Sequence, residues 1–269
     1  MVKVGVPAAP AAVSLAQAGK LDVDYLVYYA QRGVDKLRPI ADLKPIFIHD
    51  LPEPFWLNYE NPFLPEVMDA ERQMLDIAQC PWLSTGIGAS AEPQQHRGGP
   101  YREGDDKDLQ SRETVITNIV KHGTRLKEWL GDTPLLLENF NYHKTNAYEY
   151  ICEPEVVHHI LDAIGCGMLL DMAHARISAH NMGWPSAEAY YEALPLDKVK
   201  EIHITRPGWM GEQMVDLHQP LQPEDLPLLG WTLDRTPCEC VTIEIESDIT
   251  EPELLHQVAM MREYLGKRQ

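Results

Sequence analysis

Short apolar runs alternate along the chain with longer stretches of helical periodicity. The short runs are rich in Val, Ile, Leu and Tyr and have the length of strands buried in a sheet. They cover residues 2–6, 24–29, 44–50, 81–88, 134–139, 168–170, 199–205 and 241–246. Apolar residues at helical spacing predict helices at 34–43, 66–79, 109–130, 153–164, 186–194, 223–229 and 252–265. Pro39 should shorten or break the first of these.

Strands alternating with helices are typical of an α/β protein, and eight of them predict a (β/α)8 barrel. The length of 269 residues suits one such barrel. We therefore expect a single domain over residues 1–269, with 51–65 and 89–108 as loops over the barrel. A doubly wound open sheet is the alternative, because strand closure cannot be read from sequence.

Histidines and acids gather where the predicted strands end. In a barrel all carboxyl ends of the strands lie on one face, so these side chains should converge. We place His174 in the loop after strand six, and Asp216 and His218 in the loop after strand seven. The candidate metal ligands are His49, Glu138, Asp171, His174, His203, Asp216, His218 and Glu244.

Taken singly, several of these residues have an ordinary structural explanation. His203 is typical of a core histidine, Asp216 of a turn cap and His218 of a surface residue, while Glu138 suits an ion pair with a lysine or arginine. Glu244 is harder to explain, because the alternation Ile243-Glu-Ile turns it toward the barrel lumen. None of these separate explanations predicts that the residues cluster at strand ends.

A cluster of this size favours several metal ions over one. Carboxylates packed together repel one another, and two or three cations would neutralise them. Imidazole and carboxylate ligands without thiolate suit Fe(II), Mn(II) or Zn(II), with non-haem iron favoured where the two ligand types mix. The residue types leave iron, zinc and manganese open.

The composition limits the cellular location and the binding partners that we expect for this protein. The formal net charge of −18 without a basic patch disfavours nucleic acid as a partner. Five cysteines at irregular spacing indicate reduced thiols in a cytoplasmic protein. The N-terminus lacks the features of a secretion signal, and no run of roughly 18 apolar residues predicts a membrane span.

At this point the chain resembles a known family. Leu136-Leu-Glu138-Asn139, Gly167-Met-Leu-Leu-Asp171, Glu201-Ile-His203, Asp216-Leu-His218 and Ile243-Glu244-Ile-Glu246, in this order, are similar to the DUF692 group. That group comprises multinuclear non-haem iron-dependent oxidative enzymes that modify ribosomally made peptides. The resemblance spans roughly residues 23 to 255, and 136–218 is its specific part.

The resemblance implies a xylose-isomerase-like barrel with two or three irons, which bind a peptide cysteine and use dioxygen. It also implies a peptide or small thiol as substrate and, in many members, a partner protein that presents the peptide. Seven residues fall on iron-ligand positions of the family motif: His49, Glu138, Asp171, His203, Asp216, His218 and Glu244. Glu246 is expected to support a ligand or to act as a base.

The chain departs from the family at two positions. Members usually carry Asn where this chain has His174, and His at the fourth-strand exit, where this chain has Ser84-Thr-Gly86. Relative to the family, this chain gains one possible ligand at His174 and lacks one at the fourth-strand exit. The number of metal ions, and therefore the reaction, stays open.

Other metal-dependent classes fit part of the pattern. The Asp-x-x-His and Asp-x-His pairs also resemble endonuclease IV, a zinc phosphodiesterase, although the negative charge argues against a DNA substrate. Metal-dependent sugar isomerases and epimerases use fewer ligands of the same types. A metal-binding barrel without catalytic activity is the third alternative.

Overall fold

Eight parallel strands close into a barrel in the computed structural model, which describes residues 2–51, 56–59, 62–91, 109–144, 148–245 and 248–268. The order around the barrel is β1-β2-β3-β4-β5-β6-β7-β10. The bounds are β1 Lys3–Pro7, β2 Tyr25–Tyr29, β3 Ile46–His49, β4 Leu83–Gly86, β5 Leu135–Glu138, β6 Gly167–Asp171, β7 Val199–Ile204 and β10 Cys240–Ile243. Pairing of β1 with β10 closes the ring. The predicted barrel is confirmed, and the open sheet is wrong.

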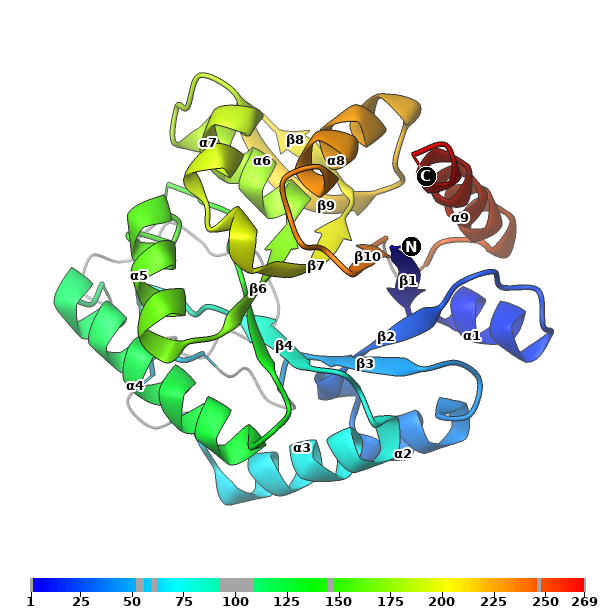
Figure 1. Cartoon of the computed structure of the whole chain (residues 1–269), viewed down its shortest axis with the longest axis horizontal. Helices are drawn as coiled ribbons and strands as arrows, with labels where there is room; N and C mark the ends of the chain where they lie inside the picture. Colours follow the sequence, from blue (N-terminus) through cyan, green and yellow to red (C-terminus); the bar gives the residue numbers. More distant parts are fainter. Residues whose placement is uncertain are drawn as a thin grey trace.

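Helices surround the ring of strands (Figure 1). In the described part of the chain they are α1 Pro10–Gln17, α2 Val34–Leu37, α3 Pro65–Ala78, α4 Arg112–Leu130, α5 Pro154–Ile164, α6 Met172–Asn181, α7 Ala187–Ala193, α8 Leu226–Leu233 and α9 Glu251–Gly266. The helix predicted at 34–43 is broken as expected, because α2 gives way to a 3-10 turn containing Pro39. No helix in the described ranges is long and apolar enough to cross a bilayer.

Helices α1 and α6 and the strands β8 and β9 are not among the predicted elements, and α6 and β9 carry candidate ligands. His174 lies in the first turn of α6 rather than in a loop, because Asp171 ends β6 and caps α6 at once. Asp216 and His218 lie on β9 Gln213–Gln219, which pairs antiparallel with β8 Arg206–Met210. The chain of 206–219 has little aliphatic periodicity, so its pairing is set by contact with α6 rather than by its own pattern.

The barrel lumen has an apolar lower layer and a polar upper layer. Side chains alternate in and out along each strand, so the inward residues stack in layers. Tyr25 and Phe47 stack with their ring centroids 4.1 Å apart, and Trp82 meets Phe47 edge-on at 5.1 Å. A Cβ at Gly5 would lie 2.2 Å from the Tyr25 ring. Glycine at this position therefore leaves room for the aromatic rings. The polar layer therefore rests on a closed aromatic floor.

The two predicted loops over the barrel lie partly outside the described residues. Within 51–65, residues 52–55 and 60–61 are not described, and within 89–108 only 89–91 are. Asn58 in the first stretch and Ala89 and Ser90 in the second are buried, so described residues of both stretches are packed against the barrel.

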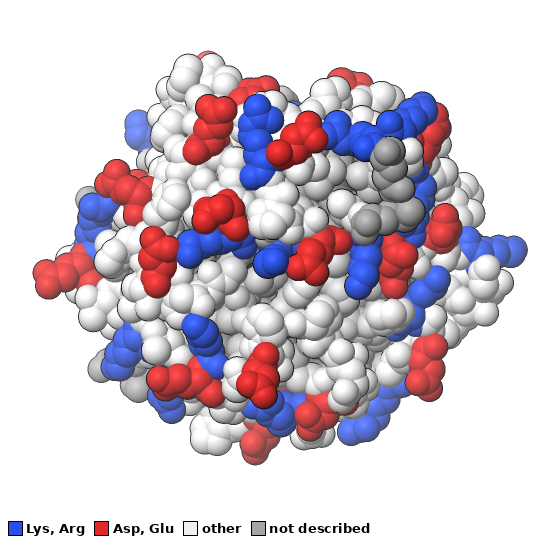
Figure 2. Space-filling view, viewed as in Figure 1, with Lys and Arg blue, Asp and Glu red and all other residues white. Residues whose placement is uncertain are grey.

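Charges of both signs are mixed on the outer surface. On the face in Figure 2, Lys and Arg side chains lie among Asp and Glu side chains, without a stripe of one sign. Surface ion pairs follow the same pattern, such as Lys198 with Asp162 at 2.7 Å and Lys200 with Glu239 at 3.1 Å. Such exposed pairs contribute little to stability.

Among the described residues of the outer core, Glu71 is a buried acid without a hydrogen-bond partner. Glu71 on α3 is fully buried, and neither of its carboxyl oxygens accepts a hydrogen bond. The neighbouring Arg72 turns away and lies 4.0 Å from the centroid of the Trp129 ring. Burial, together with the negative charge of Asp50, raises the pKa of Glu71 to about 8. The carboxyl group is therefore held mostly protonated near neutral pH.

Replacing Glu71 with Gln should stabilise the protein in alkaline buffer. The folded protein keeps a proton that the unfolded chain releases above its ordinary pKa of 4.5, so stability falls as pH rises from about 4.5 to about 8. We expect Glu71→Gln to gain on the order of 2 kcal/mol at pH 8, a rise of about 5 °C in Tm, and almost nothing at pH 5. Thermal unfolding at both pH values measures this. Asp69→Asn, an exposed change on the same helix, is the control, and an equal gain at both pH values would contradict the prediction.

Candidate metal centre

The polar upper layer of the lumen is built by the last inward residue of each of several strands. Strands β3, β5, β6 and β7 contribute one side chain each, and Glu244 follows directly after β10, where its backbone N–H still bonds to the carbonyl of Ile204. These residues are His49, Glu138, Asp171, His203 and Glu244, and all are buried. The predicted convergence at the carboxyl ends of the strands is what the fold produces.

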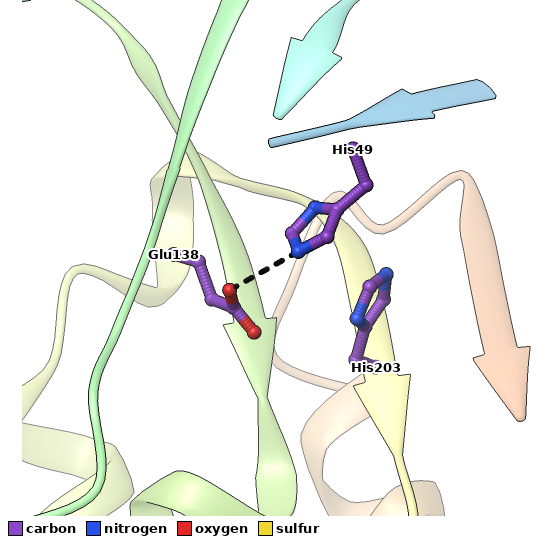
Figure 3. Close-up of side chains that lie close together, drawn as sticks. All are labelled: His49, Glu138 and His203. Carbon is purple, nitrogen blue, oxygen red and sulfur yellow. Dashed lines mark ion pairs between the residues drawn. The ribbon is translucent and has the colours of Figure 1, made fainter. Parts of the chain in front are cut away.

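One group of ligand atoms joins three strands. His49, Glu138 and His203 each offer an atom within 4.8 Å of the others, and Figure 3 shows the three side chains turned toward one another. Nε2 of His49 lies 3.4 Å from Oε2 of Glu138. Nδ1 of His49 is held 2.9 Å from the hydroxyl of Ser84. Burial alone would lower the pKa of His49, but Asp50 and Glu138 raise it to about 9.

A second group shares two of these residues. Glu138, Asp171, His203 and Glu244 also place one ligand atom each within 4.8 Å of the rest. Nδ1 of His203 lies 3.1 Å from Oε2 of Glu244, and the Tyr29 hydroxyl donates a hydrogen bond to the other oxygen of Glu244. Four residues with three carboxyl groups in one space form the most acidic part of the site.

The pKa values of Glu244 and Asp171 are shifted in opposite directions. Burial would raise the pKa of Glu244, but the His203 imidazole holds it well below the usual range. Burial raises the pKa of Asp171 to about 7, and the charges of Glu244 and Glu138 add to the rise against the opposing effect of His174. Asp171 is thus the more readily protonated of these two carboxyl groups.

A third group lies at the mouth. Oδ2 of Asp216 is 3.2 Å from Nε2 of His174 and 2.7 Å from Nε2 of His218. Nδ1 of His174 donates to the carbonyl of Asn139 at 2.8 Å, which turns Nε2 toward Asp216. His218 adopts a φ of 45°, a left-handed conformation rare for residues other than glycine. Such strain at a polar side chain is typical of functional sites.

His174 links this third group to the other two. Its Nδ1 lies 3.6 Å from Oε1 of Glu138 and 3.9 Å from Oδ1 of Asp171. The structure therefore brings all eight predicted ligands into one connected site, in which His174 stands at the junction. Glu246, the predicted base, lies outside the described residues.

Several polar atoms of the site are buried without a hydrogen-bond partner. They are Oδ2 of Asp171, Nε2 of His203 and Oδ1 of Asp216. Buried polar atoms in folded proteins are nearly always satisfied, so a group of such atoms needs an explanation. Cations bound to the carboxylate oxygens of Asp171 and Asp216 satisfy these two oxygens and offset the like charges, and the set of carboxylate and imidazole donors in the site fits iron, manganese or zinc.

Sequence reasoning missed the residues that hold the candidate ligands. Tyr29 follows Tyr25 and Val27 on the inward face of β2, so period-2 alternation was a usable signal. Ser84 stands at the fourth-strand exit, where it holds His49 instead of offering a ligand. Asn139 bonds to both the backbone N–H and the carbonyl of Asp171, at 2.9 and 3.0 Å. No local pattern indicated these pairings.

An open pocket of about 280 Å³ leads to the site. Its apolar wall is formed by Trp56 and Phe140, whose ring centroids are 5.5 Å apart. Gly86 is required here, because a Cβ on it would lie 2.7 Å from the Phe140 ring. His49, Glu138, His174, His218 and Glu244 form the polar part of the lining. The pocket suits a small group that carries apolar atoms next to a metal-binding atom.

Comparison with known proteins identifies one family and many structures of the same fold. A family model described as "RiPP precursor modification enzyme MbnB/TglH/ChrH" matches residues 61–265. A UPF0276 protein of Paraburkholderia phytofirmans is 37% identical over 90 residues, which cover 34% of this chain and 29% of that protein. A UPF0276 protein of Anaeromyxobacter sp. is 30% identical over 136 residues, 51% of this chain and 46% of that protein. The matches thus cover half or less of these two relatives.

Solved structures with similar folds are distant in sequence. A D-tagatose 3-epimerase-like protein superposes with a TM-score of 0.70 at 13% identity, covering 99% of this chain and 98% of the other. The IOLI protein with a bound zinc atom gives 0.69 at 12% identity, covering 99% of both chains. At these identities the likeness shows the xylose-isomerase-like barrel alone.

Removing Asp171 should lower the metal content without unfolding the chain, because Asp171 belongs to one of the two compact groups of ligand atoms. The Asp171 side chain also accepts the backbone N–H of His174 at 2.6 Å and so caps α6. Asp171→Ala should therefore lose metal and about 1 kcal/mol of stability, whereas Asp171→Asn keeps a capping group and should lose metal alone. Metal content and thermal unfolding measure the two effects.

His203→Ala should lose metal as well, since His203 belongs to both compact groups of ligand atoms. Asp76→Asn, an exposed change on α3, is the control and should keep its metal. Full metal content in the Asp171 and His203 variants would refute the assignment of the site.

Proposed function

Because the chain belongs to the family of RiPP precursor modification enzymes MbnB/TglH/ChrH, we propose that it is a multinuclear non-haem iron-dependent oxidase or oxygenase. RiPPs are ribosomally synthesised and post-translationally modified peptides, so the family implies a peptide substrate. The proposed substrate is a cysteine-containing peptide, with a small thiol as the simpler variant. A partner protein that presents the peptide, and a cytoplasmic location, remain predictions.

The observation that carries this proposal is the convergence of four imidazoles and four carboxyl groups in one buried site. His49, Glu138 and His203 would hold one ion, and Glu138, Asp171, His203 and Glu244 the adjacent position. His174, Asp216 and His218 would complete the set at the mouth. Sharing of Glu138 and His203 between two compact groups supports more than one metal, because one ion cannot use all these atoms.

The protein's own contribution would be to position ligands and to exclude water. Iron bound here would supply a coordination position for a thiolate and the redox chemistry with dioxygen. Tyr29 holds one oxygen of Glu244, and Asn139 holds the backbone of Asp171, so the carboxyl groups keep their orientation. Trp56 and Phe140 would cover the apolar side of the reacting residue and keep water from it. Glu246 stays a predicted base or supporting group.

A zinc-dependent hydrolase is the second candidate, and one observation favours it. His174 occupies a position where the resembled family usually carries Asn, and it contacts Asp216 directly. An added imidazole suits zinc at the mouth of the site. Sugar epimerase activity is supported by the shared fold alone. A barrel that binds metal without catalysing a reaction is the remaining alternative.

Metal analysis of protein purified without oxygen separates these alternatives. We expect two or more irons per chain with absorbance in the visible range. Two or more zinc ions per chain without iron would favour the hydrolase instead, and a single metal ion of any kind would favour epimerase-type chemistry. Protein that stays free of metal after incubation with Fe(II), Mn(II) and Zn(II) would rule out all the metal-dependent functions.

Dioxygen uptake tests the reaction itself. Iron-loaded protein should consume dioxygen when a cysteine-containing peptide encoded beside its gene is added, and the mass of the peptide should change. The same peptide with Ser in place of Cys is the matched control and should leave dioxygen consumption at its background rate. Equal uptake with both peptides would contradict the proposed role of the thiol.

A further inference from the structure

A fifth carboxyl group lies beneath the metal centre, inside the barrel. Glu201 precedes His203 by two residues on β7, so both side chains point into the lumen. Glu201 is 1% exposed and is not a member of either compact group of ligand atoms. A buried acid that deep in a barrel costs free energy unless it is hydrogen-bonded.

Glu201 is fixed by donors from other strands. Nε1 of Trp82, at the entry to β4, donates to Oε2 at 2.8 Å. The Thr242 hydroxyl on β10 donates to Oε1 at 3.0 Å and lies 2.8 Å from the hydroxyl of Tyr25 on β2. The two donors fix the plane of the carboxyl group, and the aromatic floor keeps water away from it.

His203 stands between Glu201 and the metal centre. Its Nδ1 lies 3.1 Å from Oε2 of Glu244, a member of the compact group. Its Nε2 lies 3.3 Å from Oε1 of Glu201 and makes no full hydrogen bond. One nitrogen of the ring therefore faces the candidate ligands, and the other faces Glu201.

His49 and His174 present the opposite ring nitrogen, Nε2, to the centre. Nδ1 of His49 lies against the Ser84 hydroxyl, and Nδ1 of His174 against the carbonyl of Asn139, so each presents Nε2 to the centre. Neutral groups hold both of these rings, whereas a carboxyl group faces His203. The ring that belongs to both compact ligand groups is thus the one backed by an acid.

We propose that Glu201 is a positioning residue that accepts the Nε2 proton of His203 and so presents the Nδ1 lone pair to the metal. Carboxylate acceptors behind metal-bound histidines fix the tautomer and raise the basicity of the ligand. This role rests on the proposed metal centre. The alternative is that Glu201 only ties together the strands that contribute Trp82 and Thr242.

Nuclear magnetic resonance of the wild-type protein loaded with Zn²⁺ tests the orientation without any substitution. Zinc is diamagnetic, and ¹⁵N shifts of histidine separate a metal-bound nitrogen from a protonated one. We expect His203 to carry its proton on Nε2 and the metal on Nδ1, the reverse of His49 and His174. Zinc on Nε2 of His203 would overturn the proposal while leaving the metal centre intact. Wild-type protein that binds none of Zn²⁺, Fe(II) and Mn(II) would overturn the metal centre and this role together.

Glu201→Gln tests whether the acid strengthens the ligand. The amide keeps the shape and one acceptor but loses the negative charge, so we expect Zn²⁺ to bind 10- to 100-fold more weakly, a cost typical of losing such a partner. Competition with a chelator gives the affinity, and thermal unfolding of metal-free protein gives the structural cost. Glu188→Gln, an exposed change on α7, is the matched control and should alter neither quantity.

Thr242→Val separates positioning from strand pairing. It removes one donor to Glu201 and keeps the acid, so we expect a smaller loss of zinc affinity than in Glu201→Gln. A Glu201→Gln protein with a lower Tm and unchanged zinc affinity would assign Glu201 to the structural role and overturn the proposal. If Glu201→Gln does not fold, the wild-type resonances still decide which nitrogen binds the metal.

Discussion

Four carboxyl groups and four imidazoles share the carboxyl end of one barrel, and much of the structure serves to keep them there. Like charges this close repel, and burial adds the cost of lost hydration. The chain divides the charge unequally: Glu244 is paired with His203 and kept acidic, whereas the pKa of Asp171 rises to about 7. Such a division is the ordinary response of an acidic cluster without cations, and it is typical of sites where metal or substrate completes the charge.

The lumen below the site explains how so polar a layer is tolerated. Tyr25, Phe47 and Trp82 fill the barrel with closely packed rings, two of them stacked and the third edge-on, and so separate the ligands from the space beneath. The same rings carry polar ends, and Trp82 and Tyr25 use theirs to fix Glu201 and Thr242. An aromatic floor with hydrogen-bonding groups thus serves both as core and as support for the ligands.

The mouth of the site is built differently from its base. The inner ligands come from barrel strands, which are rigid, whereas Asp216 and His218 come from the β8–β9 hairpin that packs on α6. His174 joins the two parts, since it starts α6 and contacts Glu138, Asp171 and Asp216. A change in the position of the hairpin would therefore alter the outer ligands first.

The barrel and most of the candidate ligands could be predicted from the order of residues alone. Period-2 alternation and buried apolar runs are local properties, and they were enough to place His49, Glu138, Asp171 and His203 at strand ends and Glu244 in the lumen. The first turn of α6 and the β8–β9 hairpin escaped sequence reasoning, because a single Asp both ends a strand and caps a helix, and because the hairpin lacks a pattern of its own.

Which atom of each candidate ligand faces the centre depends on contacts between strands, and the folded structure is needed to see it. The orientation of His49 depends on Ser84, 35 residues away, and that of His203 on Glu244, 41 residues away. These pairings arise when neighbouring strands of the sheet, far apart in sequence, come into register, so no local pattern encodes them. The sequence of a single strand thus indicates which residue can be a ligand. The pairing of strands in the sheet determines which atom of that residue faces the centre.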